Sequence, residues 1–153
     1  MPERWVGAVV VGDAITLVEA EVPADGAITI LADESWPLQK GDRPVAYAAA
    51  YQRISDYVTD NKISKAIVKE SAVSLGGTKK AHLLSAEFRG VVLAALASKI
   101  PTETHAKASL SKTFGERKVD DYLSDSKFWE QECKGKLRAG SREAALMILA
   151  SRD

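Results

Sequence analysis

The sequence predicts an α/β fold built on a mixed five-stranded sheet, with three antiparallel strands followed by two parallel ones and helices on its faces. Three observations lead to this prediction. The chain has 153 residues, the length of one domain, so residues 1–153 are taken as a single unit. Turn signals divide the first 37 residues into three apolar runs. Helix-like and strand-like segments then alternate, which is typical of strands joined by helical crossovers.

The opening runs predict an antiparallel meander of three strands. The first is almost continuously apolar, as expected of a strand buried on both faces. Gly12-Asp13 is a hairpin signal, and the Pro-Ala-Asp-Gly turn at 23–26 ends the second run. The three strands are expected over residues 4–11, 14–22 and 27–36.

A helix is predicted over residues 42–61 and a fourth strand over 64–69. Asp42 can cap the helix, and Pro44 is tolerated in a first turn. Apolar and aromatic residues then recur on one helical face, at positions 47, 51, 54 and 58. A helix between two strands favours parallel pairing of the fourth strand with the sheet.

The second half of the chain predicts the longest helix, a short fifth strand and further helices. The long helix has a broad apolar stripe rich in alanine. Ser141 is a candidate N-cap for the last helix. In chain order, the expected elements are the long helix at 79–99, the strand at 100–105, a mostly helical stretch at 108–125, a charged stretch at 128–138 that is irregular or forms another helical turn, and the last helix at 144–151.

The composition is that of an ordinary globular domain. The chain is 46% hydrophobic and 27% charged, which excludes wholesale disorder, collagen-like repeats and coiled coils. No apolar run reaches the length of a membrane span, and residues 1–5 do not begin a secretory signal. The single cysteine, Cys133, has no partner for an internal disulfide. These features predict a cytoplasmic protein without membrane contact.

Charge is unevenly distributed although the net charge is zero. Residues 1–60 hold 4 Lys/Arg and 10 Asp/Glu, whereas residues 61–153 hold 17 and 11. A basic C-terminal half could attract phosphate on one face. The alternative, which we favour from sequence alone, is that the two halves neutralise each other across the fold.

The order of elements and four stretches of sequence carry a resemblance to a known family. The stretches are Lys-Ala-Ile-Val-Lys-Glu at 65–70, an alanine-rich helix with an Arg-Gly pair at 85–96, the strand and lysine-bearing segment at 100–112, and the closing helix at 142–150. Together they resemble the RuvC-like branch of the RNase H-like fold over nearly the whole chain. The sequence is also similar to small, uncharacterised bacterial RuvC-like proteins, a resemblance from which no activity follows.

The resemblance implies a nuclease site with two divalent metals, held by acids in strand one, at the end of strand four and in the last helix. Mg²⁺ or Mn²⁺ would be the cofactor of such a nuclease. In this sequence Val9 stands near the first position and Glu70 at the second. The last-helix positions fall on Ser141 and Ala144, with Glu143 between them. Because only one position is clearly acidic, we expect a degenerate site that binds no metal, or Glu70 as the only surviving ligand.

The candidate catalytic residues are therefore Glu70, Glu143 and Asp13. Each has a structural alternative. Glu70 is equally well a strand-end charge, and Glu143 is favourable in a first helical turn near the positive end of the helix dipole. Asp13 lies in a hairpin turn, where Asp more often bonds locally than binds a metal.

Two basic clusters are candidates for contact with nucleic acid. Lys79 and Lys80 follow Gly76-Gly77 just before a helix start, where anions bind well, although the spacing is not that of a nucleotide-binding loop. The second cluster follows strand five, which in the RuvC-like branch is expected near the nucleic-acid backbone; its candidates are Lys107, Lys112 and Lys118. The alternative in both places is an ordinary solvated surface.

These observations support three hypotheses. The first is an RNase H-like pseudo-nuclease that acts as a nucleic-acid-binding or assembly subunit rather than as an enzyme. The second is a metal-dependent nuclease that uses Glu70 and Glu143. The third is a protein–protein interaction module. The expected partners are DNA or RNA, a protein partner or a second copy of the chain.

Overall fold

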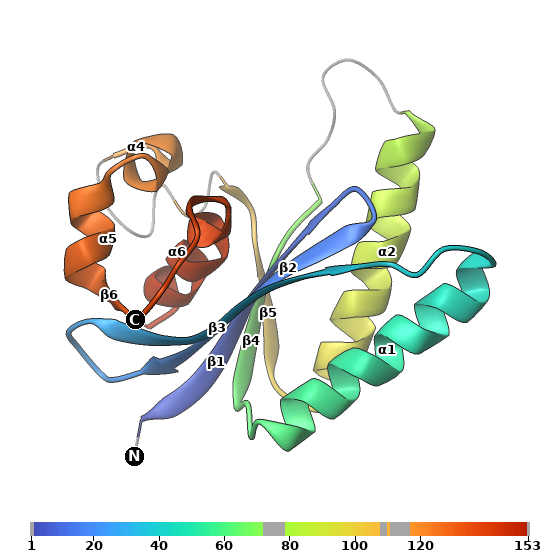
Figure 1. Cartoon of the computed structure of the whole chain (residues 1–153), viewed down its shortest axis with the longest axis horizontal. Helices are drawn as coiled ribbons and strands as arrows, with labels where there is room; N and C mark the ends of the chain where they lie inside the picture. The colour runs from blue at the N-terminus through green and yellow to red at the C-terminus, as the bar shows by residue number, and fades with distance from the viewer. Residues whose placement is uncertain (1, 72–78, 108–109, 111–116, 153) are drawn as a thin grey trace.

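The computed structural model describes residues 2–71, 79–107, 110 and 117–152. A twisted sheet lies between two layers of helices (Figure 1). Its six strands stand in the order β5-β4-β1-β2-β3-β6. The strands are β1 (Glu3–Val11), β2 (Ala14–Val22), β3 (Ile28–Pro37), β4 (Lys65–Lys69), β5 (Thr102–His105) and β6 (Cys133–Lys134).

The sheet has the predicted mixed topology. The first three strands form an antiparallel meander. Strand β4 pairs in parallel with β1, and β5 pairs in parallel with β4. Central β1 is buried from Trp5 to Val10, as its continuous apolar run indicates. The prediction of five strands misses β6, a two-residue strand that pairs in parallel with Ile28–Thr29. Two residues are too short to leave a periodic pattern in the sequence.

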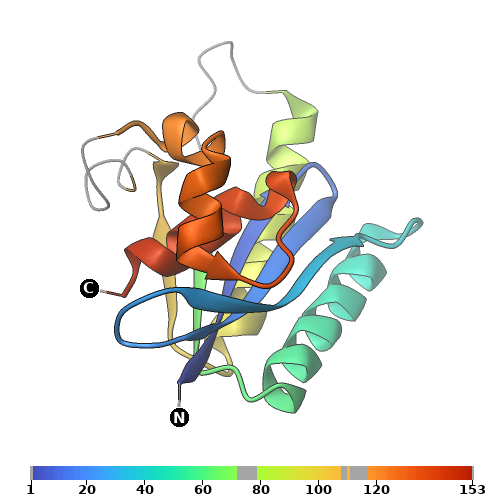
Figure 2. The same ribbon diagram turned by 60° about the vertical axis from the view of Figure 1, so that its left-hand side comes forward.

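Two separate hydrophobic cores fill the space on either side of the sheet. One face is covered by α1 (Arg43–Asp60) and α2 (Lys80–Ala97), whose side chains pack on Val6, Ala8 and Val10 of β1. The other face is covered by α6 (Arg142–Ala150), with α4 (Val119–Leu123) and α5 (Ser126–Glu132) outside it (Figure 2). Among the described residues no helix is long and apolar enough to cross a membrane.

Helix α1 begins as its sequence predicts. Asp42 caps it by accepting a hydrogen bond from the Val45 backbone N–H at 3.4 Å, and Pro44 lies in its first turn. Ile54 and Val58 are buried, but Tyr51, expected on the same face, is 38% exposed. The prediction was wrong for Tyr51 because α1 buries a narrower stripe, which includes the small residue Ala46.

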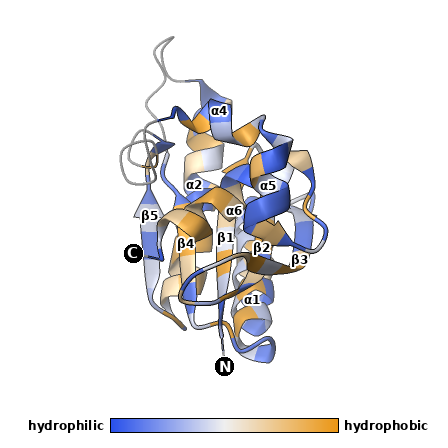
Figure 3. Cartoon of the chain, turned by 90° about the vertical axis from the view of Figure 1, so that its left-hand side faces the viewer, coloured by the Kyte–Doolittle hydropathy of each residue, from blue (hydrophilic) through white to orange (hydrophobic). Residues whose placement is uncertain are grey.

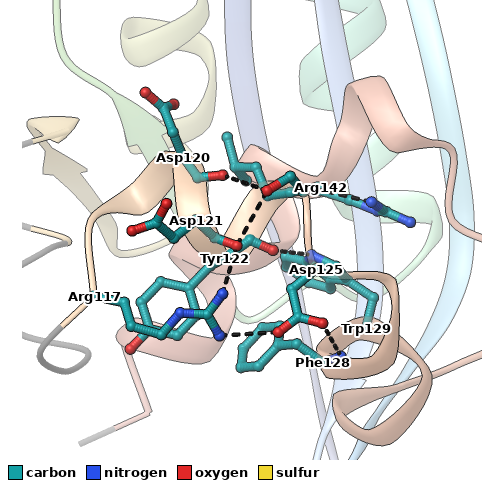
Figure 4. A network of polar contacts seen from close by, with 10 residues as sticks. Arg117, Asp120, Asp121, Tyr122, Asp125, Phe128, Trp129 and Arg142 are labelled. Atoms are coloured by element: carbon teal, nitrogen blue, oxygen red, sulfur yellow. Dashed lines mark hydrogen bonds and ion pairs between the residues drawn. The ribbon is translucent and has the colours of Figure 1, made fainter.

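The charged stretch 128–138, which the sequence predicts to be irregular or to form another helical turn, is partly helical. It contains most of α5, then β6, and it leads into a 3₁₀ turn at Ala139–Ser141. Figure 4 shows how α4 and α5 are tied together: Trp129 Nε1 donates to the Tyr122 carbonyl at 2.8 Å, and Arg117 bonds to Asp125 at 2.9 Å. Trp129 is buried, so it anchors α5 in the core. Of the predicted helical stretch 108–125, residues 108–109 and 111–116 lie outside the described residues.

Asp33 of β3 holds the start of α6 in place. Its carboxylate is 7% exposed and accepts hydrogen bonds from the backbone N–H and the guanidinium of Arg138, both at 2.8 Å. The Ser141 hydroxyl also donates to Asp33, so Ser141 does not cap α6 with its side chain as predicted. Burial alone would raise the pKa of Asp33, but the bonds from Arg138 and Ser141 outweigh burial and leave this pKa below its usual 3.8.

We expect Asp33→Asn to lower the free energy of unfolding by about 1–3 kcal/mol at neutral pH, since charge-assisted hydrogen bonds are lost. The pKa of Asp33 is lower in the folded chain, so its contribution is present above the unfolded-state pKa and is lost as pH falls through the folded-state value. Urea unfolding over a pH series should show the two proteins converging below about pH 4. A difference that persists unchanged at the acid end would contradict this assignment.

Candidate functional site

The position of the predicted metal site is set by the contact between β1 and α6. The backbone of α6 lies against Gly7: a Cβ at Gly7 would stand 2.2 Å from the Ala144 carbonyl oxygen and 3.3 Å from Ile148 Cγ1. Figure 3 shows α6 crossing in front of β1 and β4. The first turn of α6 therefore lies against the middle of β1, and Glu143 in that turn reaches Lys69 at the carboxyl end of β4. A site shared by strand one, strand four and the last helix has to lie here.

Hydrocarbon fills the β1 side of this position. Val9 lies two residues beyond Gly7 on the same face of β1, is 6% exposed and belongs to the core that contains Ile67 and Ala144. None of these three side chains offers an oxygen to a hard cation. The first ligand position implied by the resemblance therefore has no ligand.

A lysine, rather than a second carboxylate, faces Glu143. Lys69 Nζ of β4 lies 2.9 Å from Glu143 Oε1 in the first turn of α6, with side chains 27% and 17% exposed. Lys107 Nζ forms a second ion pair, with Asp120 Oδ1 at 2.8 Å. Lys107 is the main cause of the lowered pKa of Asp120, and Lys69 of the first pair is close enough to add to this effect. We call these four residues the charge cluster; its charges alternate in sign and cancel.

Glu70 and Asp13 lie elsewhere. Glu70 continues the ladder beyond β4, its N–H donating to the His105 carbonyl at 2.9 Å. Because neighbouring side chains of an extended chain point to opposite faces, Glu70 is directed away from the face on which Lys69 meets Glu143, and it is exposed. Asp13 lies in the β1–β2 turn, paired with Arg43 of α1 at 3.3 Å.

The donor set does not fit a divalent metal centre. In the part of the chain that the structure describes, no group of three or more His, Cys, Asp or Glu side chains could hold a metal ion. A carboxylate bonded to an ammonium is also a poor metal ligand, because the ammonium repels a second cation at the same oxygen. That Glu70, Glu143 and Asp13 are catalytic stays a prediction; the structure does not bring them together.

The predicted basic residues that the structure describes lie at the end of the molecule where β4 and β5 end, on both sides of the sheet. Lys79 and Lys80 are exposed at the start of α2, and Lys118 is exposed at the start of α4. Both helix starts lie at the same end of the molecule as the ends of β4 and β5, the upper side of Figure 1. Lys107 follows β5 and is 47% exposed while paired with Asp120. Lys112 lies outside the described residues.

Sequence reasoning missed the importance of Lys69. The available signal was the alternation of side chains along a strand, which places Lys65, Ile67 and Lys69 on the face of β4 that packs on α6. A lysine on a face covered by a helix needs a carboxylate partner, because an unpaired buried charge is costly. Glu143 is the only acid in the segment that forms α6, so the pair could have been proposed from the sequence.

Known proteins resemble this chain in structure, but the searches by sequence find no match. No protein-family profile matches the sequence, and no curated protein matches it. RuvC of Thermus thermophilus is similar in structure with a TM-score of 0.69 at 11% identity, covering 96% of this chain and 92% of that one. The same protein in complex with its Holliday junction substrate gives a TM-score of 0.71 at 11% identity, covering 96% and 91%. The yeast mitochondrial Holliday junction resolvase Ydc2 gives 0.66 at 9% identity, covering 99% and 78%.

Proposed function

Since the chain has the RuvC-like form of the RNase H-like fold, as its sequence predicted, we propose that it binds nucleic acid without cleaving it by a two-metal mechanism. The substrate class we favour is branched DNA, because a similar structure is a complex with a Holliday junction. The binding surface is the edge that carries the starts of α2 and α4.

The charge on that edge supports binding to a phosphate backbone. Lys79, Lys80 and Lys118 are exposed, and none of them takes part in an ion pair in the described part of the chain. Lysines that are not neutralised by acids attract phosphates without regard to sequence, and the binding they provide weakens as salt is added.

The observation that carries the second half of the proposal is the Lys69–Glu143 pair beside Val9. Two-metal cleavage needs several oxygen ligands at one place, to hold ions on both sides of the scissile phosphate. Here one implied ligand position is a buried valine, and the acid on α6 is bonded to an ammonium at 2.9 Å. The Lys69–Glu143 pair supplies one positive and one negative charge where two metal ions would need several negative ones.

The proposal is tested with fluorescently labelled four-way junctions, duplexes and single strands of equal length. Fluorescence anisotropy in EDTA at low salt should show binding, tightest to the junction, and the affinity should fall steeply as salt is raised. The same samples in Mg²⁺ or Mn²⁺ should show no cleavage on a denaturing gel. Absence of binding at low salt would refute the nucleic-acid function, and metal-dependent products would establish the nuclease alternative.

The double variant Lys79→Glu with Lys80→Glu should weaken this binding by about tenfold or more and reduce the salt slope by about two, because two phosphate contacts are replaced by repulsion. Both side chains are exposed, so the variant should unfold at the wild-type midpoint. The matched control is Lys62→Glu with Lys99→Glu. Both lysines are exposed, and they precede the amino-terminal ends of β4 and β5, whereas the proposed surface lies at the carboxyl-terminal ends. Equal affinities of the two double variants would exclude the start of α2 as a contact.

A further inference from the structure

Arg89 of α2 spans the carboxyl ends of two adjacent parallel strands. Its Nη2 donates to the Val10 carbonyl of β1 at 2.9 Å, and its Nη1 donates to the hydroxyl of Ser71, two residues beyond β4. One turn earlier on α2, Ser85 Oγ donates to the Gly12 carbonyl at 2.9 Å and fixes the helix to the β1–β2 turn. The guanidinium is therefore held in place at the edge of the sheet where α/β proteins bind their ligands.

Nothing in the described part of the chain neutralises the charge of Arg89. Arg89 takes part in none of the ion pairs formed by the described residues. Its Nε is shielded from solvent and has no hydrogen-bond acceptor among those residues. The sequence from 72 to 78 contains no acid either. Burial lowers the pKa of Arg89, as expected for a cation that has lost water without gaining an anion. A partly buried charge of this kind is costly unless something pairs with it.

Other arginines with polar contacts show what a structural role looks like here. Arg43, Arg117 and Arg138 each bond to a carboxylate. Arg142 also has a shielded Nε and no carboxylate, but it donates to the Leu123 carbonyl at the end of α4 and so ties α6 to its neighbour. Arg89 also donates to a carbonyl, but it lies at the carboxyl ends of two strands, on the helix whose start carries the exposed Lys79 and Lys80.

We propose that Arg89 is an anion-binding residue that takes a phosphate group at the carboxyl ends of β1 and β4. A guanidinium has more N–H donors than its bonds to Val10 and Ser71 use, and its planar fork matches the oxygens of a phosphate. That the phosphate belongs to a nucleic-acid backbone rests on the proposed function; the anion site itself does not.

The first experiment uses inorganic phosphate as the probe. Thermal unfolding is measured in phosphate and in chloride at equal ionic strength for the wild type, Arg89→Met, and the control Arg43→Met. Phosphate should raise the wild-type and Arg43→Met midpoints by several degrees and leave Arg89→Met unchanged. In chloride, Arg89→Met should unfold at or above the wild-type midpoint, because an uncompensated charge has been removed. A lower midpoint with the phosphate response intact would make Arg89 a structural residue and overturn the proposal.

The second experiment repeats the junction-binding assay with Arg89→Met and with Arg89→Lys, which keeps the charge but loses the fork. Binding should fall about tenfold in Arg89→Met and less in Arg89→Lys. Junction binding that is equal in all three proteins, together with a phosphate response that does not depend on Arg89, would overturn the proposal and leave the nucleic-acid function standing. Phosphate binding that depends on Arg89, with no nucleic-acid binding by the wild type, would keep the anion site and reject the proposed function. If Arg89→Met does not fold in chloride, the guanidinium is a structural requirement and the proposal is wrong.

Discussion

Gly7→Ala is expected to lower the free energy of unfolding by about 3 kcal/mol, at the upper end of the cost of overpacking a core. The added Cβ would stand 2.2 Å from the Ala144 carbonyl oxygen, which is backbone and cannot turn aside. Either α6 moves off the sheet or β1 shifts, and both changes loosen the core that contains all of the residues from Ala144 to Ala150.

Urea unfolding at neutral pH measures this effect, and Gly90→Ala is its matched control. Gly90 lies within α2, and a Cβ there would meet nothing within 4 Å. In a helix interior alanine is better than glycine by about 1 kcal/mol, so Gly90→Ala should stabilise the protein. If Gly7→Ala were as stable as the wild type, the close contact between β1 and α6 would be refuted, and with it the placement of Glu143 beside β4.

Val9→Asp is expected to cost about 3–5 kcal/mol, because it places an unpaired carboxylate in a dry core. Lys69, a cation of the neighbouring strand β4, is already bonded to Glu143. Val11→Asp is the control on the same strand: Val11 is 68% exposed, so its substitution should change stability by less than about 0.5 kcal/mol.

Adding Mg²⁺ makes the Val9→Asp experiment informative about chemistry as well as stability. We expect no recovery of the unfolding midpoint in Mg²⁺, since a single new carboxylate beside the Lys69–Glu143 pair does not complete an ion site. A Val9→Asp protein that folds normally and is stabilised by Mg²⁺ would show that the surroundings of β1 are still built for a metal.

The sheet could be predicted from the sequence because its signals are local. Turn residues at 12–13 and 23–26 separate the meander strands, and the apolar run of β1 marks it as central. Elements fixed by distant contacts could not be predicted. β6 exists only because it pairs with Ile28 and Thr29. Ser141 has the sequence of a cap, but a bond to Asp33, distant in the chain, engages its hydroxyl instead.

One feature of the candidate site could be predicted from the sequence, namely the absence of acidic residues at positions where the resemblance implies metal ligands. The resemblance to the RuvC-like branch implies an acid near the place of Val9, so a missing ligand there could be expected before the structure was known. The identity of Glu143's partner was not predictable by counting acids, because it depends on which face of β4 meets the first turn of α6. For the same reason, the unpaired charge of Arg89 becomes visible only when its surroundings are known.

Divalent-metal binding by the wild-type protein shows whether the chain forms a two-metal centre. Isothermal titration with Mn²⁺, followed by electron paramagnetic resonance of the bound ion, should show no saturable site at micromolar concentrations. Lys69→Ala should leave this result unchanged, because Val9 still offers no ligand. Binding of two ions per chain, abolished by Glu143→Gln and by Glu70→Gln, would contradict the account and make the protein a metal-dependent nuclease candidate.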